Sequence, residues 1–450
     1  MIPTLPAPGC DDPCNPGPGC PLPPPECGGG SGETLDKKKP AGKITVWDSN
    51  LGMEVPVKRT RVVARRWFKI DVVYTNDQGE FKCNKRFVNK VNILVKFLNN
   101  NITIHGLRTP RLWQMWFPIK KGIGIYSGNL SNISYRFNQN TLEPHSRTNR
   151  NWWAAQTMNS QVEFNEMAAA NNIGGLPSFL RILLTGWANA RGAGSAPMNG
   201  HRNPQIVPPL WINYFVLNPA HTGFASTLNW LYNGILIRKT DMTIGYDKNL
   251  QSDQVKSLIY HEMAHAAHYN KVGDNWWNEL VNAETYEITR FGLNGAQSPY
   301  GIGDDGEMSG RIALAESWAE HIGRVMTDTK YGTTSSAQYN QGEFYENNSP
   351  VIGLSSHLNL LEDFSPNRVS DPFRWIPYGV YYDLMDSRND YNFNAILPID
   401  NVSGYSSQTA SAVEANSATP TPQLFFPIIQ NDSILTTPPS TDGDASWSSP

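Results

Sequence analysis

Two histidines stand four positions apart in this chain, and a glutamate directly follows the first of them. The residues are His261, Glu262 and His265, in the segment YHEMAHAAHY over 260–269. On a helix, positions i and i+4 share one face, so both imidazole rings can reach one zinc ion. Glu262, one step round, faces the coordination position left open. The spacing therefore predicts a zinc site in which His261 and His265 are ligands and Glu262 is the general base.

A catalytic zinc needs a third protein ligand, and His268 is the nearest candidate. A straight helix would hold His261, His265 and His268 in a row rather than in a tetrahedral fan. The segment also lacks the glycine turn and the further histidine of the metzincin pattern. We therefore expect His268 to pack or to support the site and not to bind the metal.

Two glutamates later in the sequence compete for the third position. Glu316 lies 51 positions after His265, in the segment ALAESWAEH, with Glu320 one helical turn further on. Small residues at 313 and 319 would let that helix approach closely. We predict that Glu316 binds the metal and that Glu320 orients a ligand histidine. The alternative is Glu284, 19 positions after His265, which matches the spacing of the aminopeptidase-N-like family.

The segments HEMAHAAHY, ESWAEHIG over 316–323 and IPYGVYYDL over 376–384 together resemble poorly characterised bacterial secreted or surface metallopeptidases with a gluzincin-like site. The turn over 75–81, TNDQGEF, resembles the hairpin of carboxypeptidase-regulatory-like (transthyretin-like) domains, with Asn76 where that pattern has Asp. The resemblance implies a zinc metallopeptidase that acts on polypeptides and carries an accessory β domain at its front.

The expected chemistry is hydrolysis of a peptide bond by a water molecule that the metal activates. Glu262 would accept the proton of this water and pass it to the leaving amine. Tyr381, Tyr382 and His357 are left open as donors to the oxyanion, and endo or exo action is not decided. The alternative is a surface binding or adhesion protein that keeps such a fold without turnover.

The surrounding pattern predicts the elements that position these residues. A helix that Ser252 or Asp253 caps should carry the histidines, after a short strand over 241–246. Further helices are expected over 152–170 and 177–188. Short alternating runs between 42 and 107 predict strands, although the run over 91–95 is also compatible with a helix.

The chain divides into four predicted regions, and the predicted fold class is α+β multidomain. A Pro/Gly-rich tether over 1–40 holds Cys10, Cys14, Cys20 and Cys27. A small antiparallel β-sandwich over 41–110 precedes a mostly helical, zincin-like catalytic domain over 111–398. A low-complexity tail follows over 399–450.

Composition excludes several classes of partner. The 450 residues include 37 basic and 40 acidic side chains, a net charge of −3, which gives no electrostatic footprint for nucleic acid or for anionic lipid. No run approaches the roughly 18 to 20 apolar residues that span a bilayer. The low charged fraction of 17% suits an exported or cell-surface protein, held to lipid or to a surface through the tether, with a cytoplasmic one as the alternative. The basic residues over 58–61 and 65–66 are expected on a solvated face.

Overall fold

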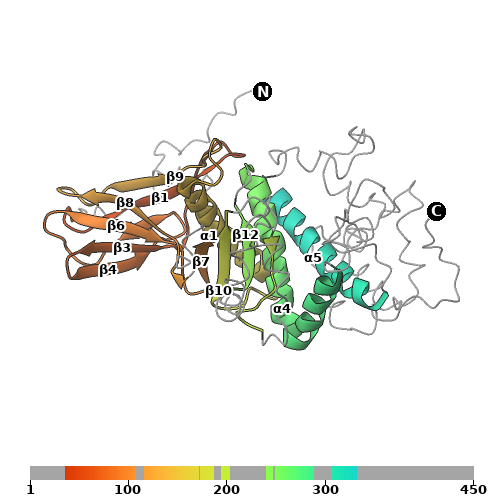
Figure 1. Ribbon diagram of the computed structural model, residues 1–450. Helices are drawn as coiled ribbons and strands as arrows, with labels where there is room; N and C mark the ends of the chain where they lie inside the picture. The colour runs from red at the N-terminus through yellow and green to blue at the C-terminus, as the bar shows by residue number, and fades with distance from the viewer. Residues whose placement is uncertain are drawn as a thin grey trace, which may run out of the picture.

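The computed structural model describes residues 36–107, 116–171, 173–186, 194–202, 240–246, 249–287 and 306–331. Over these ranges the chain has a mixed α/β fold with three β-sheets and three helices (Figure 1). The helices are α1 (Arg147–Ala170), α4 (Ser252–Glu287) and α5 (Gly306–Tyr331). None of the helices in these ranges is long and apolar enough to cross a membrane. The four cysteines of the predicted tether and the predicted tail lie outside the described residues.

The first sheet is built around β1 (Ala41–Asp48). β2 (Met53–Pro56) and β5 (Glu80–Lys82) pair with β1 in the antiparallel sense, and β9 (Ile133–Phe137) pairs with it in the parallel sense. Ile44 and Val46 of β1 are fully buried. This sheet thus has one apolar face that contributes to the core.

The second sheet is entirely antiparallel, in the order β4-β3-β6-β8. Its strands are β3 (Arg61–Arg66), β4 (Lys69–Tyr74), β6 (Val91–Lys96) and β8 (Lys120–Tyr126). The run over 91–95 is therefore a strand. Alternate residues of these strands join Ile44 and Val46 in one hydrophobic cluster.

The third sheet is mixed, in the order β11-β12-β10-β7. β7 (Ile102–Leu107), β10 (Leu180–Thr185) and β12 (Met242–Gly245) are parallel, and β11 (Gly194–Ser195) is antiparallel to β12. The helix predicted over 177–188 is wrong. Its segment LRILLT forms β10, in which only Arg181 is exposed. A strand between parallel neighbours carries consecutive buried apolar residues, here Ile182, Leu183 and Leu184, and such a run does not distinguish it from a buried helix.

Strand pairing crosses the boundary that was predicted at residue 110. β7 lies before this residue and pairs with β10, whereas β8 and β9 lie after it and pair with β6 and β1. Each sheet therefore contains strands from both sides of residue 110. Helix α1 lies between β9 and β10 in the sequence, whereas α4 and α5 follow β12.

Helix α1 is tied to the first sheet by hydrogen bonds from buried polar side chains. Trp152 Nε1 donates to the carbonyl oxygen of Trp47 at 2.8 Å, and Asn159 Nδ2 donates to that of Pro56 at 2.7 Å. Trp152 and Trp153 are fully buried. Helix α1 packs on α4, and α4 packs on α5, so the three helices lie beside one another (Figure 1).

Candidate metal centre

Helix α4 carries both predicted histidines on one face and begins after β12, as expected. Of the two predicted caps, Asp253 Oδ1 accepts the amide of Gln254 at 2.7 Å, whereas Ser252 Oγ accepts the amide of Ser49 at 2.8 Å. The helix is interrupted at Gly273, whose φ of 79° lies in the left-handed region that glycine favours. This break separates the half with the histidines from the half with Glu284.

Helix α5 approaches α4 closely at Gly323. A Cβ atom at this position would lie 3.1 Å from the carbonyl oxygen of Ser257 and 3.3 Å from the amide nitrogen of His261. Ala319, one turn earlier, is fully buried, in agreement with the predicted small-residue face. Because the two backbones come this close, the short side chain of Glu316 reaches the histidines.

His261, His265 and Glu316 form one compact group of donor atoms. The two Nε2 atoms of the histidines are 3.1 Å apart, and Glu316 oxygens lie 3.4 Å from His261 Nε2 and 3.6 Å from His265 Nε2. With zinc bonds of about 2.0–2.2 Å, two corners of a tetrahedron are about 3.3–3.5 Å apart. The contact to His261 is made by Oε2 of Glu316 and the contact to His265 by Oε1, so the spacing of the three side chains is close to that of three ligands of one zinc ion.

Glu320 contacts His261 at Nδ1, the ring nitrogen that is not part of the donor group. Its Oε2 lies 3.2 Å from His261 Nδ1, and its other oxygen accepts a hydrogen bond from Arg324 Nε. This contact leaves Nε2 of His261 directed at the donor group, which is how carboxylates orient metal-binding histidines. Among the described residues, His265 Nδ1 has no corresponding hydrogen bond.

The charges of the group suit a cation. Burial alone would lower the pKa of His261, but hydrogen bonds to Glu316 and Glu320 raise it well above its ordinary value. Burial lowers the pKa of His265 to about 4. The two carboxylates thus favour a positive charge at His261. Metal binding at such a group releases protons, because the ligand atoms must be deprotonated.

Glu262 is buried against the edge strand β11. A Cβ atom at Gly194 would lie 2.3 Å from Glu262 Oε1, so the carboxyl group fills the space that any larger residue needs. Glu262 is 3% exposed, and burial together with the charge of Glu316 raises its pKa to about 8. A carboxyl group with a pKa near neutrality can both take up and return a proton.

Glu284, the alternative third ligand, is buried nearby but does not belong to the donor group. Its pKa is raised well above the ordinary value by burial and by the charges of Glu316 and Glu262. The positive charge of Arg202 acts in the opposite direction. Three carboxyl groups therefore share a buried region, and the structure brings Glu316 rather than Glu284 to the two histidines.

His268 lies away from the donor group. It is fully buried, and its ring packs against Trp276 in a tilted arrangement and against Trp277 edge-on, with ring centroids 4.6 and 5.4 Å away. Burial lowers its pKa to about 3. The position agrees with the prediction that His268 packs. Tyr381, Tyr382 and His357 lie outside the described residues.

Sequence reasoning missed three residues that shape this region. Arg324 follows Glu320 by one helical turn, a spacing that favours an ion pair and was available as a signal. Gly323 and Gly194 act by lacking a side chain, and a glycine in a helix or in a short strand gives no local sign of the neighbour that comes close. Only the tertiary structure identifies them.

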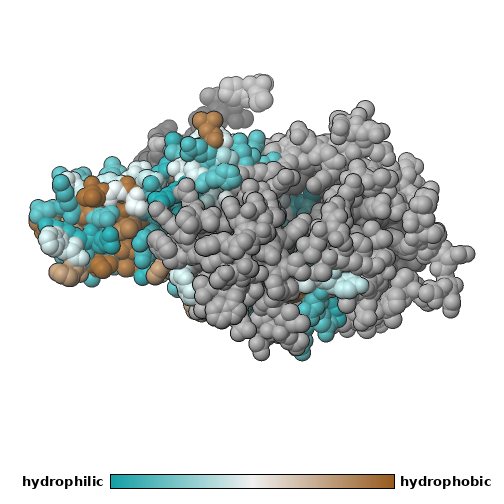
Figure 2. All heavy atoms as spheres, in the orientation of Figure 1, coloured by the Kyte–Doolittle hydropathy of each residue, from teal (hydrophilic) through white to brown (hydrophobic). Residues whose placement is uncertain are grey.

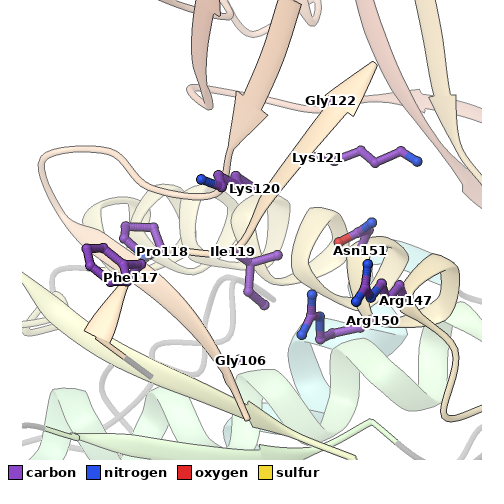
Figure 3. A pocket seen from close by; sticks show the side chains of 10 residues that line it. All are labelled: Gly106, Phe117, Pro118, Ile119, Lys120, Lys121, Gly122, Arg147, Arg150 and Asn151. Atoms are coloured by element: carbon purple, nitrogen blue, oxygen red, sulfur yellow. The ribbon is translucent and has the colours of Figure 1, made fainter. Parts of the chain in front are cut away.

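A separate cavity of about 510 Å³ lies at the start of β8 and the first turn of α1 (Figure 3). Arg147 and Arg150 lie together beneath Ile119, and Lys120 and Lys121 are among the lining residues. None of the predicted site residues is among its described lining residues. The cavity and the donor group are therefore distinct features of the chain.

Searches of protein-family models, of curated proteins and of solved structures each gave no match to this chain.

Proposed function

We propose that this protein is a zinc-dependent hydrolase of peptide bonds. One observation carries the proposal: donor atoms of His261, His265 and Glu316 all lie within 4.8 Å of one another, a spacing that three ligands of one zinc ion can have. A buried carboxyl group, Glu262, follows the first histidine in the sequence and lies close enough to Glu316 for its charge to raise the pKa of Glu262.

When bound, zinc supplies a Lewis acid that polarises a carbonyl group and lowers the pKa of water to about 7. The chain supplies the remaining steps. Glu320 fixes the ring of His261, Glu262 accepts a proton on its carboxylate from the attacking water, and Glu262 then returns this proton to the leaving amine. Its burial against Gly194 keeps the carboxyl group in one position.

The proposal also includes a division of the chain into two structural units. The first two sheets form a β-sandwich, and the third sheet and the helices form a zincin-like catalytic unit. The pairing of β8 with β6 and of β9 with β1, and the packing of α4 on α5, support this division, and buried residues of both parts join one hydrophobic cluster. The substrate is a polypeptide. The charge-poor composition supports a location outside the cell or at its surface.

Metal content tests the ligand assignment directly. The purified full chain should bind one equivalent of zinc by mass spectrometry of the metal. Glu316→Gln should lose this zinc, whereas Glu284→Gln, a matched change at a buried carboxyl group, should keep it. Retention of zinc by Glu316→Gln together with its loss in Glu284→Gln would transfer the ligand role to Glu284.

Hydrolysis of an unstructured protein such as casein tests the activity. Glu262→Gln should keep the metal and lose at least 100-fold in rate, since general acid–base catalysis contributes about 10²–10⁴-fold. Full activity of this variant would refute the role of Glu262. Zinc binding without turnover of casein or of a mixed peptide library would favour the alternative of an inactive binding protein.

A further inference from the structure

The outward face of the second sheet combines cations with apolar side chains. Side chains alternate between the two faces of a strand. The inner face of this sheet, which includes Val62 and Ala64, is buried in the core, and the outward face is the opposite one. Four of its positions are cations and none is a carboxylate. Its residues, here called the outer face, are Arg61, Val63, Arg65, Ile70, Val72, Tyr74, Asn92, Leu94, Lys96, Lys120, Gly122 and Ile125.

The one acidic residue in these four strands is turned away from the outer face. Asp71 is buried, 6% exposed, and accepts a hydrogen bond from the amide of Lys85 at 2.7 Å. A chain with 40 acidic residues thus presents a sheet face that lacks them. Figure 2 shows hydrophobic and hydrophilic side chains interleaved over the end of the molecule where Figure 1 places these strands.

The hairpin between β3 and β4 extends this face with two aromatic side chains. Trp67 is 85% exposed and Phe68 is 99% exposed. Trp67 has a φ of 48°, a backbone conformation that a bulky residue rarely adopts. Arg66 and Lys69 flank the pair. The turn therefore holds two large apolar groups in water, beside cations and at the tip of the fold.

The cations of the outer face are crowded. Burial lowers the pKa of Lys96, and the neighbouring charges of Arg61, Lys120 and Arg65 lower it further. Like charges at this density disfavour one another, and an anionic surface opposite them would relieve that repulsion. The charge complementarity of this face is therefore with an anionic partner.

We propose that the outer face and its Trp67–Phe68 tip dock on the surface of a bilayer that contains anionic lipids. Trp67 and Phe68 are almost fully exposed, so they can enter the layer between headgroups, whereas a folded protein partner would need a matching pocket for them. Tryptophan favours the membrane–water interface, and lysine and arginine at that depth are attracted to anionic headgroups. The exposed aliphatic side chains of the outer face, Ile70, Val72 and Ile125, fit the same layer, whereas Val63 and Leu94 are buried between their neighbours.

Vesicle co-sedimentation with the full chain tests this proposal. Binding should be at least five times stronger to vesicles of phosphatidylcholine with 30% phosphatidylglycerol, about one lipid in three, than to pure phosphatidylcholine. It should weaken at high salt, because salt screens the attraction. Equal binding to the two vesicle types, or none at low salt, would overturn the proposal.

Matched variants locate the contact. Trp67→Asn should weaken binding about tenfold or more, because it removes a large apolar group that enters the lipid layer. Phe179→Asn is the control, since Phe179 is also an exposed aromatic residue with positive φ, 62°, outside the outer face. Replacing Arg65 by Gln should weaken binding about fivefold. Phe179→Asn should leave binding unchanged, and an unchanged affinity in both Trp67→Asn and Arg65→Gln would contradict the proposal.

Two further readouts separate lipid docking from folding and from self-association. Brominated acyl chains should quench part of the tryptophan fluorescence, and Trp67→Tyr should abolish this quenching while keeping vesicle binding. Phe68→Ser, at a position without positive φ, should reduce binding even if Trp67→Asn fails to fold. A concentration-dependent dimer in analytical ultracentrifugation that Phe68→Ser abolishes would assign the face to a second copy of the chain and overturn the proposal.

Discussion

Gly194 and the carboxyl group of Glu262 are in such close contact that position 194 has no room for a side chain. A Cβ atom there would lie 2.3 Å from Oε1 and 2.6 Å from Cδ of Glu262. Gly194→Ala should therefore displace the carboxyl group and lower the rate of peptide hydrolysis about 100-fold, since a shift of about 1 Å in a catalytic group has that effect.

Zinc content separates this effect from loss of the site. Gly194→Ala should retain the metal, because the three atoms nearest to a Cβ at position 194 all belong to Glu262 and none to His261, His265 or Glu316. Gly174→Ala is the matched control, since a Cβ at Gly174 meets no atom within 4 Å. A rate within twofold of the parent protein in Gly194→Ala would show that Glu262 is not held by this contact.

The histidine pair was predictable because its spacing is local: four residues on one helix fix the relative position of two rings. Glu316 was harder, because its place depends on how α5 packs on α4. Its partner Glu320 one turn later made the prediction possible, and the structure brings both to His261. Gly194 could not be predicted, because β11 is placed by pairing with β12 across the sheet.

Three helices meet around the carboxylate of Glu163. This residue of α1 accepts hydrogen bonds from Lys256 and Tyr260 of α4 and from Lys330 of α5, with Lys256 Nζ at 2.6 Å. Lys256 is fully buried. Glu163→Gln leaves this ammonium group without its counter-charge, so the free energy of unfolding should fall by about 3 kcal/mol in chemical denaturation.

Glu166→Gln is the matched control on the same helix. Glu166 pairs with Lys58 and Arg59 at the surface, where it is 49% exposed, so its replacement should cost less than about 1 kcal/mol. An equally small cost for Glu163→Gln would show that the buried network does not hold the helices together.

The stabilisation that Glu163 contributes should depend on pH in a defined direction. Burial would raise the pKa of Glu163, but Lys256 and Lys330 outweigh burial and lower it to about 2. The stabilisation is therefore present above the ordinary pKa of 4.5 and is lost as the pH falls toward about 2. The difference between the parent protein and Glu163→Gln should shrink as the pH falls from about 5 to 3.

The type of an element was predictable where its apolar residues recur with a clear period. The prediction failed where nearly all residues of the element are buried. The helix predicted over 152–170 lies within α1, and the strand predicted over 241–246 contains β12. The alternation of Val62, Ala64 and their neighbours indicated a half-buried strand correctly. The segment of β10 has no such alternation, because only Arg181 is exposed and Ile182, Leu183 and Leu184 are buried in succession.

Zinc should stabilise the whole molecule if α4 and α5 both supply ligands, because unfolding separates them. At a free zinc concentration 100 times the Kd, the free energy of unfolding should rise by about 2.7 kcal/mol. Thermal unfolding with and without a chelator measures this as a change in Tm. Glu316→Gln should abolish the change, whereas Glu279→Gln, at an exposed carboxylate of α4, should keep it.

A rise in Tm of the same size in Glu316→Gln would place the stabilising metal elsewhere in the chain.

At the scale of the whole molecule, the sequence predicted a chain with both sheets and helices, which the structure shows. It did not predict that strands on both sides of residue 110 would share sheets, because the pattern of each strand is local while its choice of partner is not.

The order of strand pairing also governs how this chain can fold. Gly42 of β1 pairs with Ile133 of β9, and Ile102 of β7 pairs with Leu180 of β10, so each closure spans well over 70 residues. Such long-range pairing is slow, because loop entropy is lost before the contacts form. During synthesis at about 5–20 residues per second, His265 leaves the ribosome some 3 to 10 s before Glu316. The histidines must therefore wait for their third neighbour until most of the chain has already been made.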